Sequence, residues 1–149
     1  MNVNYSLSNL EEISYNMNCD MADGETIDQS KVNFRIEYKI RANRPKNEIT
    51  TVVYVFMVDT SRNIELIKEG VRATFKVEPF DTVVKSIDDH EMKVTAPALI
   101  DTFLNVSIGA IRGILAKDLK GSPLSGMVLP LIPIQGIREN SMKDEKSEG

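Results

Sequence analysis

The chain has a single cysteine, Cys19, among its 149 residues, so it lacks the pairs that a disulfide framework within one chain requires. This cysteine content is compatible with a reducing compartment. The amino end, MNVNYSLSN, carries neither a basic leader nor the apolar stretch that a secretory signal needs. We therefore expect no secretory signal and a cytoplasmic protein.

Positive charge is also in short supply. The 18 basic residues are outnumbered by 22 acidic ones, which gives a formal net charge of -4 and a pI near 5.1. Nonspecific binding to nucleic acid depends on lysine and arginine displacing counterions from phosphates, and this composition disfavours it. We expect no nucleic-acid partner.

Residues able to carry out chemistry are few. The only histidine, His90, lies in the run DDHE at positions 88–91, where adjacent residues rarely converge on one ion. An exposed turn is favoured over a metal site, because no second His or Cys cluster has ligand spacing. Cys19 matches no cysteine-protease signature, and no Walker lysine and serine follow the GSPLSG glycines. We expect no enzymatic activity, metal or cofactor, and a metal-dependent enzyme centred on His90 is the alternative.

What the chain does have is a series of apolar patterns with a period of two, the signature of strands. A slip near Leu10 in the first pattern and a change of parity at Gly70 in the last one each predict a bulge. Short turns predict that the last three strands are antiparallel neighbours. The third strand is apolar on both faces, which predicts burial on both sides. The predicted strands are 3–17, 32–41, 49–58 and 64–78.

Two connections separate these strands from one another and from the last third of the chain. The polar stretch 19–31 predicts a long exposed connection, and 81–95 predicts a loop with one helical turn. With 42% hydrophobic residues, the chain is long enough for one domain but not for a second core. We expect a single domain over residues 1–135 and a disordered charged tail over 136–149.

From Pro97 the period changes to that of a helix, because proline fits the first helical turn. The apolar arc covers about half of the circumference, wider than the roughly 100° stripe that one sheet face requires. Such a helix has two packing partners. Polar side chains on the opposite arc, Asp101, Asn105 and Arg112, argue against a membrane span. On that arc Gly109 and Gly113 predict a close contact, either with a local loop or with another subunit.

Residues 121–123 end the helix, and an apolar ribbon cut by two prolines follows at 124–134. This ribbon either covers its own sheet or helix, or it forms the wall of a groove for extended apolar peptides. Its exposure decides between these two interpretations.

The order of elements and three motifs resemble the SecB-type export chaperones and the SecB-like chaperones associated with toxin–antitoxin systems. The sequence at 73–77 is similar to the family's fourth strand, and the proline-initiated helix PALIDTFLNVSIGAIRGIL contains the family's Arg-Gly step at Arg112–Gly113. GSPLSGMVLPLIP holds the Leu-Pro segment at Leu129–Pro130. The resemblance covers about residues 3 to 135. Of the Phe-Pro-Tyr step in the proteobacterial export chaperones, only one aromatic residue, Phe103, is present.

The resemblance implies an α+β subunit, a four-stranded antiparallel sheet packed with one long helix in the C-terminal half, and assembly into a dimer or tetramer. It also implies an ATP-independent holdase that binds unfolded polypeptides, with protein export as one context. A translocation motor or an antitoxin is a further expected partner. The alternative is a structural or regulatory protein on the same fold with one dedicated partner, for example a toxin–antitoxin component.

Two sets of apolar residues follow from this hypothesis. We expect client binding at the first strand, the segment after the fourth strand and the ribbon, specifically at Tyr5, Leu7, Tyr15, Met17, Phe80, Leu129 and Ile132. We expect the subunit interface on the helix, at Phe103, Ser107, Ala110, Ile111 and Ile114.

Overall fold

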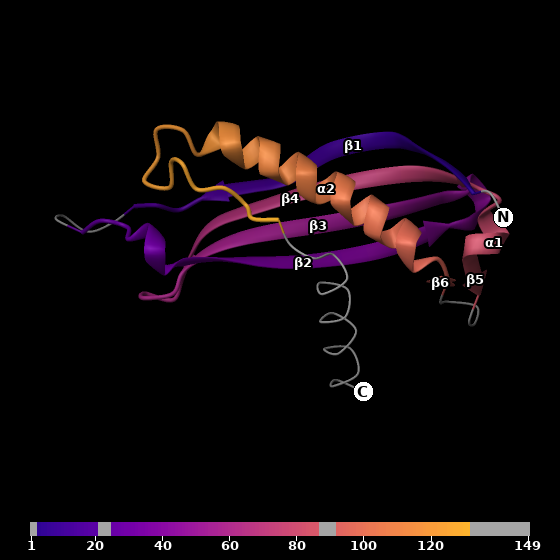
Figure 1. Ribbon diagram of the computed structural model, residues 1–149, viewed down its shortest axis with the longest axis horizontal. Helices are drawn as coiled ribbons and strands as arrows, with labels where there is room; N and C mark the ends of the chain where they lie inside the picture. The colour runs from indigo at the N-terminus through magenta and orange to yellow at the C-terminus, as the bar shows by residue number, and fades with distance from the viewer. Residues whose placement is uncertain (1–2, 21–24, 87–91, 132–149) are drawn as a thin grey trace.

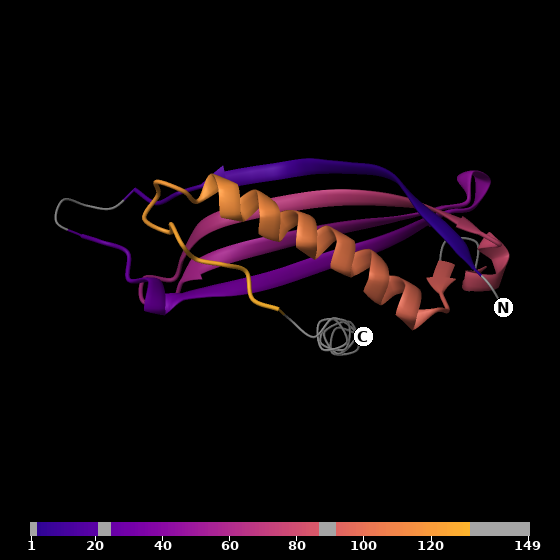
Figure 2. The same cartoon turned by 45° about the horizontal axis from the view of Figure 1, so that its top comes forward.

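The computed structural model describes residues 3–20, 25–86 and 92–131 (Figure 1). Four long strands form one antiparallel sheet in the order β1-β4-β3-β2. Their bounds are Asn4–Met17 (β1), Val32–Asn43 (β2), Glu48–Asp59 (β3) and Ile64–Glu78 (β4). One long helix, α2 (Pro97–Asp118), runs diagonally across one face of this sheet (Figures 1 and 2). The predicted α+β class and four-stranded antiparallel sheet with one long helix are confirmed. The expected tail at 136–149 and the DDHE run lie outside the described residues.

Short elements connect the long ones. Two 3-10 turns precede β2 and β3, η1 (Gln29–Lys31) and η2 (Arg44–Lys46). After β4 comes the short helix α1 (Phe80–Val83), which is the single helical turn that the sequence predicted there. The remainder of that segment was predicted as a loop, but its ends pair as a small antiparallel hairpin of β5 (Val84–Ser86) and β6 (Met92–Val94).

The core lies between α2 and the face of the sheet beneath it, which we call the helix side. Buried residues of α2 follow the helical period, and those of β3 alternate as expected for a strand. By length and a mean hydropathy of 1.5, α2 could cross a membrane, but in this fold it is a core helix. Its buried residues are Leu99, Phe103, Leu104, Ser107, Ile108, Ile111 and Leu115.

The face of the sheet away from α2, the open side, is not covered by another layer of the described chain. The prediction that β3 is buried on both faces is therefore only partly right. Phe56 is buried because Arg35 lies 4.4 Å above its ring. Lys68 lies 5.0 Å from the ring centre of the half-buried Tyr54. These cationic side chains cover the aromatic rings on the open side, where no second apolar layer does so.

The strand irregularities differ from the prediction at two points. β1 has register shifts on both sides of Leu10, between Leu7 and Asn9 and between Glu12 and Ser14, instead of one near Leu10. Gly70 is not a bulge, since it pairs in register with Ser14 of β1 and Tyr54 of β3. A Cβ atom at Gly70 would lie 2.7 Å from the Tyr54 ring, so the glycine is needed for space.

Candidate functional site

The ribbon after α2 folds back over the sheet on the β2 side of the helix (Figures 1 and 2). Leu124 and Leu129 are buried in the same core cluster as α2 and β3. Arg112 of α2 donates hydrogen bonds to the carbonyl oxygens of Leu129 and Pro130, at 2.8 and 3.0 Å. Gln29 donates to the carbonyl oxygens of Pro123 and Ser125, which flank the first residue of the ribbon. The ribbon is thus fastened to its own subunit and supplies one of the two packing partners expected for α2.

This placement corrects the prediction for Leu129, whose side chain is only 2% exposed and faces the core. It cannot contact a client while the ribbon stays in place. Among the large apolar residues of the described part of the ribbon, Val128 and Leu131 face solvent, with exposed fractions of 64% and 88%. Ile132, also predicted to bind clients, lies outside the described residues.

An uncovered apolar row remains on the helix side of β1, and we call it the β1 surface. It consists of Tyr5, Leu7, Leu10 and Tyr15, which are 40–48% exposed. β1 is an edge strand, paired with β4 alone, and α2 lies mainly over β3 and β4, with its C-terminal end reaching β1 (Figure 2). The Tyr5 ring and the Phe103 ring of α2 make a T-shaped contact at 5.5 Å between centroids, so the row is continuous with the core. Exposed apolar rows of this kind mark binding surfaces.

Leu10 belongs to the β1 surface but was not among the predicted residues. With a strict period of two, Leu10 would lie on the other face of the sheet from Leu7. The bulge between Leu7 and Asn9 adds one residue, so Leu10 returns to the helix side opposite Ala73. The slip in the sequence pattern was the signal that could have identified it.

Two further predicted client residues are less accessible. Phe80 is 4% exposed and packs in the core cluster near the start of α2. Its prediction as a contact residue is corrected for the same reason as Leu129. Met17 is half-buried at the end of β1, against the main core cluster.

The residues predicted for the subunit interface divide into two groups. Phe103, Ser107 and Ile111 are fully buried within the subunit. Phe103 stacks on Phe75 at 3.8 Å, and the Ser107 hydroxyl lies 3.0 Å from that of Thr51. These three contact the chain's own sheet and are corrected to core residues. Ala110 and Ile114 are half-buried on the flank of α2, and for them the interface stays a prediction.

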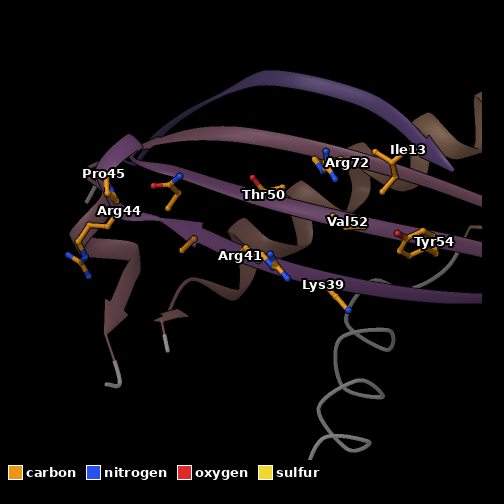
Figure 3. Close-up of a pocket in the computed structure, with 11 residues that line it drawn as sticks. Ile13, Lys39, Arg41, Arg44, Pro45, Thr50, Val52, Tyr54 and Arg72 are labelled. Carbon is orange, nitrogen blue, oxygen red and sulfur yellow. The ribbon is translucent and has the colours of Figure 1, made fainter. Parts of the chain in front are cut away.

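The open side carries a shallow hollow of about 740 Å³ at the η2 end of β2 and β3 (Figure 3). Four cationic residues line it, and no carboxylate does among the lining residues of the described chain. Arg72 pairs with Glu11 at 2.9 Å and Arg44 pairs with Asp81, which neutralises part of this charge. The hollow can attract anionic groups. Its basic residues are Lys39, Arg41, Arg44 and Arg72.

Cys19 follows β1 and is half-buried. Burial and the carboxylate of Asp20 raise the pKa of its thiol. A raised pKa lowers the fraction of the nucleophilic thiolate at neutral pH. The environment of Cys19 therefore disfavours the thiolate.

No protein-family model and no curated protein matches the chain. Among solved structures it is similar to the SecB-like chaperone Rv1957 of Mycobacterium tuberculosis, in complex with a ChAD peptide from the HigA1 antitoxin. The TM-score is 0.53 at 9% identity, over 87% of this chain and 88% of that one. A protein of unknown function from Streptococcus agalactiae matches with a TM-score of 0.48 and 9% identity, over 88% of this chain and 100% of that one. The chain has the SecB-like fold.

Proposed function

We propose that the protein is a SecB-like chaperone, an ATP-independent holdase that binds unfolded or apolar polypeptide segments in the cytoplasm without enzymatic activity. The β1 surface carries this proposal, because it leaves Tyr5, Leu7, Leu10 and Tyr15 about half exposed on an edge strand. The SecB-like fold supports it, since a solved protein with that fold holds a peptide.

An edge strand suits extended clients for two physical reasons. Its unpaired backbone groups can hydrogen-bond to an added strand, which provides affinity that does not depend on sequence. The apolar row beside it contributes about 25 cal/mol per Å² of buried apolar surface, which is nondirectional. One surface can then hold many clients.

Suppression of aggregation of an unfolded client tests the proposal. We expect the wild-type protein to suppress aggregation at stoichiometric amounts, and Leu7→Ser with Leu10→Ser to lose most of this effect. The matched control is Asn4→Ser with Asn16→Ser, on the same strand but the opposite face. Thermal unfolding of each variant shows whether it is folded. No protection by the folded wild-type protein, or equal loss in both variants, would contradict the proposal.

The packing of the ribbon against its own subunit favours a second candidate function, that of a regulatory protein. Because Arg112 holds the ribbon and Leu129 is buried, part of the expected client groove is sealed by the chain itself. A regulatory protein with one dedicated partner, for example a toxin–antitoxin component, would need no wider groove. Purification with a single folded partner, together with no binding of an apolar reporter dye, would favour this function over the holdase.

We also propose that the chain forms a homo-oligomer, a dimer or tetramer. The flank of α2 with Ala110 and Ile114 is only half-buried, which leaves apolar surface that a second subunit can cover. Light scattering behind a size-exclusion column measures the mass. A monomer at micromolar concentration would contradict this assembly.

A further inference from the structure

Glu69 of β4 is a buried carboxyl group without a hydrogen-bond donor. Its exposed fraction is 0%, and it lies on the helix side of the sheet, paired with Tyr15 of β1 and Val55 of β3. Neither carboxylate oxygen receives a hydrogen bond from the residues that the structure describes. An unpaired buried carboxylate is costly, so this position needs a proton or a cation.

Two more carboxylates converge on Glu69 from other elements. One oxygen each of Glu12, Glu69 and Asp118 lies within 4.8 Å of the other two. Glu12 comes from β1, and Asp118 is the last residue of α2, whose C-terminal end reaches the β1 side of the sheet (Figure 2). Glu12 and Asp118 are exposed, so the cluster opens to solvent.

The electrostatics of this cluster favour a positive charge. Burial raises the pKa of Glu69 to about 8, and a proton shared with the Glu12 carboxyl group and the negative charges of Glu12 and Asp118 contribute to this rise. The C-terminal end of α2 adds the negative end of the helix dipole to these three acids. In the described part of the chain no ion pair reaches Glu69.

We infer that Glu12, Glu69 and Asp118 form a binding site for a divalent cation of the oxygen-preferring class, Ca²⁺ or Mg²⁺. Carboxylate oxygens are the ligands that these hard cations prefer, and they complete their shells with water, which the exposed side of the cluster supplies. The site has none of the nitrogen or sulfur ligands typical of zinc. The ion would join the edge strand β1, the central strand β4 and the end of α2 beside Tyr15 of the β1 surface.

Titration of the metal-stripped full chain with CaCl₂ and with MgCl₂ tests this inference, by calorimetry and by thermal unfolding. We expect one ion per chain for at least one of the two cations, with a saturable rise in Tm. Glu69→Gln should weaken that binding by at least about tenfold, because it removes the central charged ligand.

Glu69→Gln should still fold, since glutamine keeps the shape of the side chain and carries no charge at this buried position. The matched control is Glu11→Gln, a neighbour of Glu12 that faces the open side and pairs with Arg72. It should bind the ion like the wild type. The inference is overturned if the wild type binds neither ion at about 1 mM, the weakest range of protein calcium sites, or if both variants bind equally.

Discussion

Arg112 of α2 donates a hydrogen bond of 2.8 Å from its Nε atom to the backbone carbonyl oxygen of Leu129. A ribbon interrupted by prolines cannot form a regular backbone ladder, so its carbonyl groups need donors from elsewhere. The guanidinium group supplies two, since it also reaches Pro130 at 3.0 Å. These two bonds fasten the ribbon to α2 where the Leu129 side chain enters the core.

Replacement of Arg112 by methionine should release the ribbon. We expect the free energy of unfolding to fall by about 1–3 kcal/mol, because two carbonyl acceptors, the one at Leu129 part-buried and the one at Pro130 exposed, lose a charged donor. Binding of an apolar reporter dye should rise as Leu129 becomes exposed. Urea unfolding and dye fluorescence measure the two effects. Arg41→Met, at an exposed position of β2, is the control and should change neither. An unchanged dye signal in the Arg112 variant would show that the ribbon is held without the arginine.

On the open side of the sheet, the Tyr54 ring packs against Gly70 and leaves no room for a side chain there. A Cβ atom at position 70 would lie 2.7 Å from the Tyr54 ring and 3.2 Å from the Cβ atom of Ser14. Gly70→Ala should therefore cost about 1–3 kcal/mol of stability through overpacking. In a Tyr54→Ala background the same change should cost less. Urea unfolding of the four proteins gives the coupling energy, and a coupling of zero would contradict the steric explanation.

The strands and α2 could be predicted from the sequence because local periodicity reports which face of an element is buried. The same periodicity cannot tell which surface covers that face. Phe103, Ser107 and Ile111 were predicted to contact another subunit, although the chain's own sheet covers them. The carboxylate cluster was missed because Glu12, Glu69 and Asp118 are far apart in the sequence and meet only through the strand register and the end of α2. To predict which face of the sheet Leu10 occupies, the exact position of the bulge must be known, and that position depends on the pairing of β1 with β4.

Gly109 and Gly113 of α2 were left with two interpretations, a local contact or a contact between subunits. Apart from the adjacent residues and the backbone of α2 itself, nothing in the described chain lies within 4 Å of a Cβ atom at either position, so the structure shows no contact with a local loop there. Gly109→Ala with Gly113→Ala should raise the free energy of unfolding by up to about 1 kcal/mol per site, through helix propensity. Thermal unfolding measures this gain, with the mass in solution unchanged. A loss of assembly in the double variant would place the glycines at a subunit contact.

Asp59, at the end of β3, should make stability depend on acid pH. Its carboxylate accepts hydrogen bonds from the Ser61 hydroxyl at 2.6 Å and from the Arg62 guanidinium at 2.9 Å. These bonds, the Ser61 hydroxyl first, lower the pKa of Asp59 below its ordinary value. The unfolded chain therefore binds a proton more readily than the folded one. The stabilisation is complete above the unfolded pKa of about 3.9 and is lost as the pH falls through the folded pKa. Asp59→Asn should lower Tm at pH 7, and this deficit should shrink as the pH falls below about 4. Exposed Asp20→Asn serves as the control. A deficit for Asp59→Asn that stays constant from pH 7 to the acid range would show that its charge is not what stabilises the turn.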